Sequence, residues 1–337
     1  MKILVIRLSS IGDVLLTTPV VRCLKRQLDG AEIHFLTKPA NADLLASNPN
    51  IDRIVTLTDD TEAMVRDLRN ECYQLVVDLQ NNRRSRRVRR ALGCPMTVYN
   101  KENCHKFWYV ITKHDVMSGR HVVQRYLAAV AQLGVVDDGG GLELFLRDDV
   151  TEQLSQYKFH NTRYVVIACG SQHRSKTIPP ERVLWLAERL AQSGLHVVLV
   201  GDKRDKENIG RAVSAGPDAL AENIHNMCGA ASLLLSAAIV SRAAAAVCPD
   251  SAMMHIASAF GVPVFAVWGS TVPSFGFEAY RVRHVNYENN SLPCRPCSRA
   301  GCDRCRKRDF ECMTGNDWER IATDVLRFVR SSDTNTD

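Results

Sequence analysis

The 337-residue sequence contains no apolar stretch that approaches the roughly 20 residues of a membrane-spanning helix. It also lacks the Gly-x-x-x-x-Gly-Lys-Ser/Thr loop of P-loop nucleotidases and the Gly-x-Gly-x-x-Gly turn of dinucleotide-binding proteins. These absences weaken interpretations as a membrane-spanning protein, a kinase, an ATPase or a dehydrogenase. Met1-Lys2-Ile3 begins a strand-like run where a secretory leader would carry a charged region and a cleavage site.

The composition is that of a globular protein, with 45% apolar and 24% charged residues. The chain is longer than one hydrophobic core usually supports, so we expect two domains of about 150 residues each. The formal net charge of +6 favours anionic partners without identifying them. Most of the twelve cysteines are scattered through apolar segments, which favours reduced thiols, a cytosolic compartment and no disulfide framework.

The chain opens with an apolar, strand-like run from Lys2 to Ile6, followed by Arg7-Leu-Ser-Ser-Ile-Gly-Asp13 and a helix-like run from Val14 to Leu28. Such a turn places polar groups at the carboxyl end of a strand, where α/β sheets bind ligands. We expect Asp13 at or near the N-cap of the helix. It is either an ordinary cap or a carboxylate base facing a ligand.

The first half continues with predicted strands at 32–37, 51–57 and 74–79 and a helix at 62–70. The last strand delivers Gln80 to a strand end, ahead of a run of six arginines. At helical spacing several of these arginines share one face, which suits phosphate or carboxylate groups, although a charge run is also typical of a solvated helix. The run comprises Arg83, Arg84, Arg86, Arg87, Arg89 and Arg90.

The second half repeats the alternation of strands and helices. A turn-like Asp-Asp-Gly-Gly-Gly at 137–141 indicates a domain boundary between about 137 and 160. Strands are predicted at 164–169, 196–200, 243–248 and 263–268, and helices at 180–193, 232–241, 251–260 and 316–330. The pattern predicts two α/β units, each with a doubly wound parallel sheet.

Two loops of the second half combine a strand end with polar residues. Gly170-Ser-Gln-His-Arg-Ser-Lys176 could hold phosphates through Ser171, Ser175 and above all Lys176, or it is simply a polar loop with an exposed lysine. In Cys248-Pro-Asp-Ser-Ala-Met-Met-His255, Ser251 caps a helix and Asp250 suits the two hydroxyls of a ribose.

Three stretches resemble glycosyltransferase family 9, the ADP-heptose:lipopolysaccharide heptosyltransferases. They are the opening turn through Asp13, the 171–176 loop, and 249–257 followed by 261–269. The resemblance implies a GT-B fold, in which two Rossmann-like doubly wound domains face a central cleft. It places an acceptor-binding domain at 1–155, a nucleotide-sugar domain at 156–315, and a terminal helix at 316–332 that could pack back on the first domain.

The resemblance also implies roles for single residues. Asp13 resembles the family's catalytic base, Lys176 its donor-phosphate lysine, and Asp250 its contact to the ADP-sugar. The middle loop matches more loosely, which puts Ser171 and Ser175 in doubt as phosphate ligands. Residues within the same motifs but with less defined roles are Ser9, Ser10, Gly12, Ser251, Met254 and His255.

The implied reaction moves a heptose from ADP-heptose to a lipopolysaccharide inner-core acceptor. A base for the acceptor hydroxyl and positive charge for the departing diphosphate are its chemical requirements. Because no Asp-x-Asp occurs in the chain, we expect an inverting displacement that needs no metal. Gln80, Arg83 and Arg84 would then meet the anionic acceptor, and the arginines could also attract the anionic inner membrane.

The segment 294–312 holds five cysteines, spaced Cys-x2-Cys-x4-Cys-x2-Cys with one more beyond. The pairs are of zinc-ligand type, although zinc ribbons separate their pairs by about fifteen to twenty residues. Cysteines at this position also resemble many members of the family. Structural zinc and reduced, partly buried thiols both remain open for Cys294, Cys297, Cys302, Cys305 and Cys312.

Two alternatives accompany this interpretation. A member of the same family could use a different sugar or acceptor. A zinc-stabilised nucleic-acid-binding protein would explain the cysteines and arginines, but the arginines lack interleaved aromatic residues, so we expect no nucleic-acid partner. We expect a cytoplasmic enzyme, peripheral on the inner membrane, without a catalytic cofactor. The sequence leaves the oligomeric state open, with a monomer as the expectation.

Overall fold

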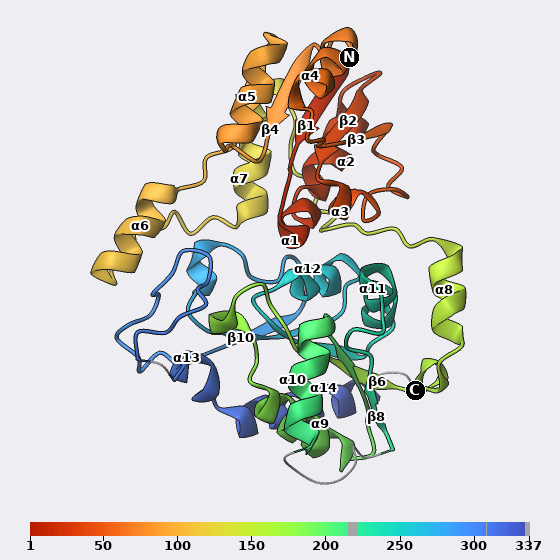
Figure 1. The fold of residues 1–337 in the computed structure, drawn as a ribbon, viewed down its shortest axis with the longest axis vertical. Coiled ribbons are helices and arrows are strands. Elements are labelled where there is room, and N and C mark those ends of the chain that lie inside the picture. The colour runs from red at the N-terminus through yellow and green to blue at the C-terminus, as the bar shows by residue number, and fades with distance from the viewer. Residues whose placement is uncertain (215–221, 308, 334–337) are drawn as a thin grey trace. The chain divides into compact units, whose positions relative to one another are not determined.

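A computed structural model describes residues 1–214, 222–307 and 309–333 (Figure 1). The chain divides into two compact units. The N-terminal unit comprises Met1–Asn103 and Ser118–Phe145, and the C-terminal unit comprises Cys104–Met117 and the chain from Leu146 onward.

The N-terminal unit is built on a five-stranded parallel sheet with the strand order β3-β2-β1-β4-β5. Its strands are β1 (Lys2–Ile6), β2 (Glu32–Thr37), β3 (Arg53–Thr56), β4 (Leu75–Asp78) and β5 (Met96–Val98). The central strands are rich in Val, Ile and Leu and buried on both faces, as parallel strands covered by helices require. The strand order reverses between β1 and β4, so the loops that follow these two strands form the switch point of the sheet.

The helices of this unit are α1 (Ile11–Leu15), α2 (Thr18–Gln27), α3 (Pro39–Ala42), α4 (Thr61–Asn70), α5 (Arg83–Leu92) and α7 (Val122–Ala128). The single helix predicted from Val14 to Leu28 is wrong, because the run is divided into α1 and α2. Pro19 lies in the first turn of α2, where its missing N–H is tolerated but where it prevents continuation from α1.

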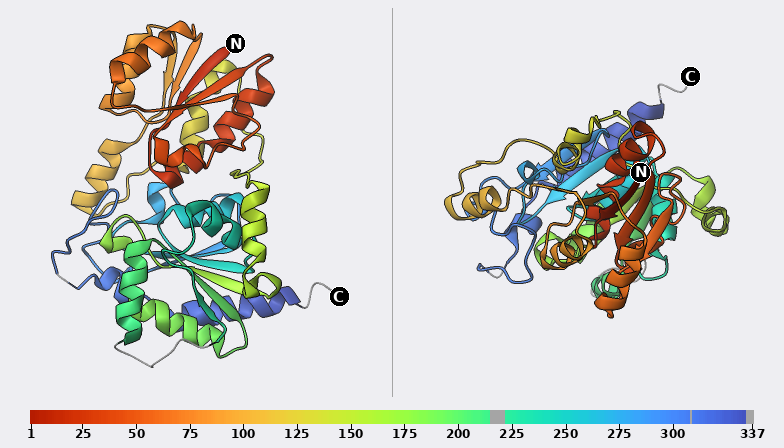
Figure 2. Two further views of the ribbon diagram at one scale, coloured as in Figure 1. Left: turned by 45° about the vertical axis from the view of Figure 1, so that its right-hand side comes forward. Right: turned by 90° about the horizontal axis from the view of Figure 1, so that it is seen from above.

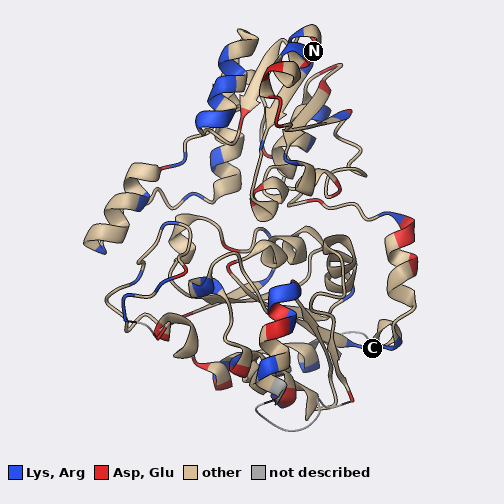
Figure 3. Cartoon of the chain, viewed as in Figure 1, with Lys and Arg blue, Asp and Glu red and all other residues tan. Residues whose placement is uncertain are grey.

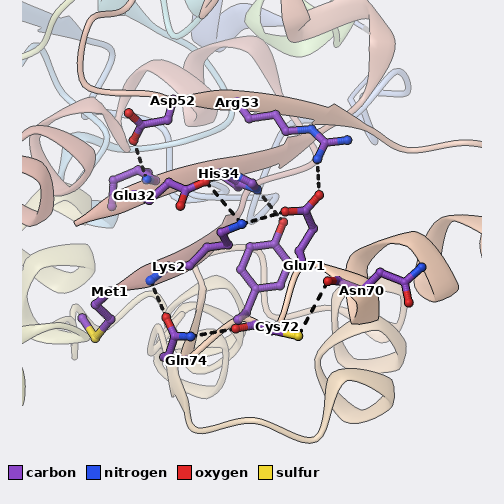
Figure 4. Close-up of polar contacts among 12 residues, drawn as sticks. Met1, Lys2, Glu32, His34, Asp52, Arg53, Asn70, Glu71, Cys72 and Gln74 are labelled. Carbon is purple, nitrogen blue, oxygen red and sulfur yellow. Dashed lines mark hydrogen bonds and ion pairs between the residues drawn. The ribbon is translucent and has the colours of Figure 1, made fainter. Parts of the chain in front are cut away.

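A polar network closes the amino end of this sheet (Figure 4). The Lys2 ammonium lies 2.8 Å from Glu71 and 3.4 Å from Glu32. The buried His34 ring contacts the Tyr73 hydroxyl at 2.8 Å and Glu32 at 2.9 Å. These groups satisfy one another at the end of the sheet opposite the switch-point loops.

The C-terminal unit holds a six-stranded parallel sheet with the order β11-β10-β9-β6-β7-β8. Its strands are β6 (Tyr164–Ala168), β7 (His196–Val200), β8 (Ile224–Asn226), β9 (Ala245–Pro249), β10 (Val264–Trp268) and β11 (His284–Glu288). Its helices are α6 (Asn103–Thr112), α8 (Asp148–Ser155), α9 (Pro180–Ala191), α10 (Lys203–Ser214), α11 (Leu233–Ser241), α12 (Ala252–Ala259), α13 (Glu311–Thr314) and α14 (Trp318–Asp333). The two predicted doubly wound parallel sheets are thus confirmed.

The division into units differs from the predicted domains in three places. The contact boundary falls at Phe145 rather than at residue 155, and residues 104–117, which carry most of α6, belong with the C-terminal unit. α14 lies beside α9 (Figure 2) and buries Trp318, Ile321 and Val325 in the core of the C-terminal unit. Its apolar face is therefore used in that core, and packing of the terminal helix on the first domain stays a prediction.

Charged side chains are distributed unevenly over these elements, and α5 is the most basic helix (Figure 3). Only Ser85 and Val88 of α5 are buried. Among the described residues, no helix has both the length and the apolar character needed to cross a bilayer.

Candidate active site

The turn after β1 is organised by reciprocal contacts between Ser10 and Asp13. Ser10 is the N-cap of α1, so Asp13 occupies the third helical position rather than the cap itself. The Ser10 backbone N–H donates to Asp13 Oδ2 at 3.0 Å, and its hydroxyl donates to the same oxygen at 2.7 Å. Gly12, inside the short helix, is buried. The turn thereby holds the Asp13 carboxylate at the carboxyl end of the central strand.

Arg7 is the electrostatic partner of Asp13. Its guanidinium is 5% exposed and lies 2.7 Å from Asp13 Oδ1, and it also donates to the carbonyls of Leu79 and Ser9 at 2.6 and 2.9 Å. Burial is the largest single influence on the pKa of Arg7 and lowers it, but the negative charge and hydrogen bond of Asp13, together with the nearby Tyr126 and Tyr99, raise the pKa overall. Arg7 therefore compensates the charge of Asp13 on one side. Because the Asp13 side chain is 20% exposed, the carboxylate also stays accessible.

Gln80 holds the same turn through its side-chain oxygen. This oxygen accepts from the backbone N–H groups of Leu8 and Ser9 at 2.8 and 3.2 Å, and the residue is 7% exposed. These contacts give Gln80 a structural role, and its contact with an acceptor stays a prediction. A glutamine two residues beyond a strand can serve either purpose, and only the position of the neighbouring strand decides which.

The arginine run forms most of α5, but its members differ in surroundings. Arg89 lies 3.0 Å from the fully buried Asp78 and is tied to the sheet. Arg83 and Arg84 are exposed, and with Ser9 they line an open pocket of about 330 Å³ in the N-terminal unit. The pocket is completed by Leu8, Lys38 and Asn82. Lys38 and Asn82 were missed by the sequence analysis, because neither belongs to a motif.

Three further residues surround the Arg7–Asp13 pair. The Arg7 guanidinium lies over the Tyr126 ring at 5.6 Å, and the rings of Tyr126 and Tyr99 meet edge to face at 4.5 Å. Burial raises the pKa of Tyr99 to about 12. Burial, reinforced by Arg7, lowers the pKa of Lys101 from its ordinary value. Tyr99 and Lys101 follow β5 and Tyr126 belongs to α7, and nothing in their sequence pattern indicated them.

In the C-terminal unit, three loops bring Lys176, Asp250 and Thr271 together. The Lys176 ammonium lies 2.9 Å from Asp250 Oδ2, which also accepts from the Thr271 hydroxyl at 2.7 Å. The lysine and aspartate side chains are 13% and 11% exposed. The sequence analysis named Lys176 and Asp250 from separate motifs, and the structure places them in contact. Thr271 was missed.

The serines of the 171–176 loop have structural partners. The Ser175 hydroxyl is 1% exposed, contacts the Ser270 hydroxyl at 2.7 Å and accepts from the Cys302 N–H at 2.8 Å. Its hydrogen bonds are thus made inside the protein, and a role for Ser175 as a phosphate ligand stays a prediction. The partly buried Ser171 donates to the Asp250 carbonyl at 3.3 Å.

Ser251 begins α12 in an extended conformation, as the sequence predicts for a cap. Its hydroxyl is buried and has no hydrogen-bond partner among the residues that the structure describes. Met254 and His255 are 0% and 4% exposed and lie within the helix rather than at its open end. Of the three, only Ser251 lies at the helix terminus, where backbone N–H groups are unpaired and attract anions.

The cysteine segment, 294–312, holds in place the loop after β10, which carries Thr271. The buried Arg295 donates to the carbonyls of Gly269 and Thr271 at 2.6 and 2.9 Å. The Cys297 N–H donates to the Ser270 carbonyl at 3.1 Å. A Cβ atom on Gly269 would lie 2.0 Å from the Ser175 carbonyl oxygen, so only glycine permits this approach.

Within the parts of the chain that the structure describes, no group of three or more His, Cys, Asp or Glu side chains is arranged to hold a metal ion. Burial raises the pKa of Cys297 to about 11 and that of Cys312 to about 12, which favours neutral thiols. Metal binding requires thiolates. Structural zinc at the five cysteines stays a prediction.

Residues 61–306 match the sequence model of the family described as glycosyltransferase family 9 (heptosyltransferase). Lipopolysaccharide heptosyltransferase 1 of Pseudomonas aeruginosa is 24% identical to this chain, and the match covers 99% of each protein.

The E. coli ADP-heptose lps heptosyltransferase II structure superimposes with a TM-score of 0.76 at 20% identity, over 99% of this chain and 100% of that one. The structure of E. coli heptosyltransferase WaaC with ADP-2-deoxy-2-fluoro heptose gives 0.66 at 18% identity, over 98% and 100%. These likenesses confirm the predicted GT-B fold class.

Proposed function

This chain belongs to glycosyltransferase family 9 and is a glycosyltransferase, and we propose that it transfers a heptose from ADP-heptose to a lipopolysaccharide inner-core acceptor. Because the chain belongs to this family, we no longer interpret it as a zinc-stabilised nucleic-acid-binding protein. The relatives named lipopolysaccharide heptosyltransferase support the choice of sugar and acceptor. The structure of a relative with an ADP-heptose analogue supports the choice of donor.

The observation that carries the proposal is the setting of Asp13. Its carboxylate is compensated by a buried arginine at 2.7 Å, oriented by Ser10 and still 20% exposed. A carboxylate that is ionised, oriented and accessible meets the requirements of a general base. An ordinary helix cap needs neither the arginine nor the accessibility.

The C-terminal unit supplies the groups for the donor. Lys176 offers an ammonium for the diphosphate, and the open N-terminus of α12 at Ser251 offers unpaired N–H groups to an anion. Asp250 and Thr271 offer oxygens suited to hydroxyl groups of the nucleotide or sugar. In this proposal Lys176 exchanges part of its contact with Asp250 for the phosphates when the donor binds.

The proposed reaction is a single displacement. Asp13 accepts the proton of the acceptor hydroxyl while that oxygen bonds to the anomeric carbon of the heptose. The bond from the anomeric carbon to the diphosphate oxygen breaks, and ADP leaves with the electron pair. Lys176 and the α12 N–H groups stabilise the charge that develops on the diphosphate. Attack from the face opposite the leaving group inverts the anomeric centre, and the protein cations supply the charge that a metal supplies in enzymes with an Asp-x-Asp motif.

The acceptor is proposed to meet the pocket of Ser9, Lys38, Arg83 and Arg84. Two arginines and a lysine around one pocket suit the phosphate and acid-sugar groups of an inner core. Such an acceptor is carried by a lipid, so the enzyme is proposed to work at the cytoplasmic face of the inner membrane.

The test is turnover of ADP-heptose on a truncated lipopolysaccharide. Asp13→Asn preserves the size of the side chain and removes the base, so kcat should fall by about 10²-fold or more while the donor still binds. Asp29→Asn, at an exposed aspartate of the same unit, is the matched control and should keep full activity. Full activity of Asp13→Asn would overturn the proposed mechanism.

The donor is tested separately by thermal unfolding. ADP-heptose should raise the melting temperature more than ADP alone or other nucleotide sugars do, because a ligand that binds only the folded state stabilises it. Lys176→Met should weaken this protection. Stronger protection by a different nucleotide sugar would instead favour a family member with another donor.

A further inference from the structure

Helix α6 exposes an unusual set of apolar side chains to solvent. Phe107, Trp108 and Ile111 are 52%, 56% and 58% exposed, and Val116, just beyond the helix, is 38% exposed. We call these four residues the α6 patch. In the described part of the chain, only Met1, Met96 and Val136 are other large apolar residues of comparable exposure, and they are scattered. A contiguous exposed apolar patch marks an interaction surface.

The opposite side of α6 is firmly attached to the C-terminal unit. The Lys113 ammonium donates to the carbonyls of Cys294 and Pro296 at 3.1 and 2.7 Å. Lys106, only 6% exposed, lies 4.4 Å from the centre of the Phe277 ring, and Tyr109 packs edge to face on Phe275. These contacts fix which face of the helix points outward. The exposure of the α6 patch is therefore not the result of a loosely held helix.

The surroundings of the patch are basic. The Arg299 guanidinium lies 5.9 Å from the centre of the Phe107 ring. The segment 294–307, on which α6 rests, holds five Lys and Arg and one Asp, and of the five cations only Arg295 is buried. Arg304, Arg306 and Lys307 of this segment are exposed. Apolar and aromatic side chains bordered by cations are complementary to the surface of an anionic bilayer, where rings enter the headgroup region and cations meet phosphates.

We propose that the α6 patch docks the C-terminal unit on an anionic phospholipid surface, with Phe107, Trp108 and Ile111 entering the headgroup region and Arg299 contacting lipid phosphates. The site lies on the C-terminal unit, separate from the pocket of Arg83 and Arg84. This docking surface rests on the proposed function in one respect only, namely that a lipid-borne acceptor is presented at such a surface. Tryptophan is enriched at membrane–water interfaces, and helices that lie in the interface bury Trp, Phe and Leu there. A second protein would not require the basic border.

The first experiment measures binding to vesicles by co-sedimentation of the full chain. Wild-type protein should bind vesicles that contain phosphatidylglycerol and bind pure phosphatidylcholine much more weakly. The triple variant Phe107→Ser, Trp108→Ser, Ile111→Ser should lower the partition coefficient by about tenfold or more, because it removes the inserted apolar area. Met96→Ser with Val136→Ser, at two exposed apolar positions of the other unit, is the matched control and should bind like wild type.

Trp108 provides a second readout. It is 56% exposed, whereas Trp268 and Trp318 are 0% and 3% exposed and Trp185 is partly buried against the core of the C-terminal unit. Vesicles with phosphatidylglycerol should shift tryptophan emission to the blue, bromine-labelled lipids should quench it, and both effects should be lost in Trp108→Phe. Arg299→Glu should reduce binding to the anionic vesicles while leaving the residual binding to phosphatidylcholine unchanged.

Activity measurements distinguish this proposal from the proposed function. The triple variant should use a water-soluble, deacylated acceptor as wild type does, and should be slower only on acceptor embedded in vesicles. Absence of turnover on every acceptor would overturn the proposed function and leave the vesicle result standing. Wild-type binding of vesicles by the triple variant would overturn the docking surface. So would concentration-dependent self-association of the wild type that the triple variant abolishes, since the patch would then join two copies of the chain.

Discussion

Asp13 and Asp205 occupy the same local motif at the ends of two different strands. Asp13 follows β1, and its carboxylate accepts from the Ser10 N–H at 3.0 Å. Asp205 follows β7, accepts from the Asp202 N–H at 2.9 Å, and donates its own N–H to Asp202 Oδ1 at 3.0 Å. Both are therefore acidic residues in the first turn of a helix, bonded back to the residue three positions earlier.

Their electrostatic surroundings are opposite. Asp13 faces the guanidinium of Arg7. Asp205 is 4% exposed and packs under Gly170 and Gly201, where a Cβ on Gly170 would lie 2.0 Å from its carboxylate oxygen. Burial, together with the nearby negative charge of Asp202, raises the pKa of Asp205 to about 6.

The difference teaches that a capping motif fixes the position of a carboxylate but not its charge. Asp13 is compensated and accessible, which suits an acid–base role. Asp205 is enclosed, so it releases its proton less readily than an exposed aspartate, and it serves the packing of the loops above β6 and β7. Four substitutions test this contrast, and their expected effects range from several kcal/mol to a few tenths of a kcal/mol.

Arg7→Met should have the largest effect, because it leaves Asp13 without its cation and the Leu79 carbonyl without its donor. The unfolding free energy should fall by about 3–5 kcal/mol, as expected when one partner of a buried pair is removed. Activity should drop, and the acid limb of the pH–rate profile should move to higher pH, since the carboxylate would then bind a proton more readily. Arg26→Met, at an exposed arginine, serves as the control. An unmoved acid limb would contradict the role of Arg7.

Asp205→Asn should stabilise the protein at neutral pH. The folded-state pKa of Asp205, about 6, lies above its ordinary value of 3.8, so the unfolded state loses the proton first as pH rises. Wild-type stability therefore falls between about pH 4 and pH 6, and the asparagine variant escapes this loss. The gain should be on the order of 1–3 kcal/mol at pH 8 and should vanish near pH 4. Denaturant unfolding at the two pH values measures it, and an equal gain at both would show that burial of the charge is not the cause.

Ser10→Ala should have a smaller effect, confined to activity. The substitution removes the hydroxyl donor at 2.7 Å from Asp13 but leaves the backbone N–H and Arg7 in place. We expect kcat to fall about five- to tenfold, the value of one hydrogen bond worth about 1 kcal/mol. Steady-state kinetics with saturating donor measure it. A loss as large as that of Asp13→Asn would mean that Ser10 itself takes part in the reaction.

Asp202→Asn should have the smallest effect. Asparagine can still accept from the Asp205 N–H, but it removes a negative charge that raises the Asp205 pKa. Because the Asp202 side chain is 63% exposed, the gain in stability should be only a few tenths of a kcal/mol. The decline of stability between pH 4 and pH 6 should become shallower. An unchanged slope would assign the shift in Asp205 to burial alone.

Much of the site could be predicted from the sequence, because its motifs are local. The strand, the turn and the acidic residue at Asp13 lie within thirteen positions, and Lys176 and Asp250 each follow a strand directly. Hydrophobic periodicity locates the strands, and the residues just after them are the ones that a parallel sheet presents to a ligand.

Residues whose role depends on distant partners could not be assigned in this way. Gln80 is 72 positions from the Leu8 N–H that it receives, and Ser175 is 127 positions from Cys302. Thr271, Lys38 and Lys101 belong to no motif, and only folding brings them to the two sites.

The sequence by itself determined the two α/β units, the capped turn that carries Asp13, and the positions of Lys176 and Asp250 just after strands. Each depends on periodicity or on contacts between near neighbours, which a linear pattern records. Only the tertiary structure decided that Arg7 compensates Asp13 while Asp205 is buried, and that α6 turns its aromatic face outward. It also decided that Gln80 bonds to the turn after β1 and Ser175 to Ser270 and Cys302. Charge state and exposure depend on which atoms surround a side chain, and long-range packing sets those surroundings.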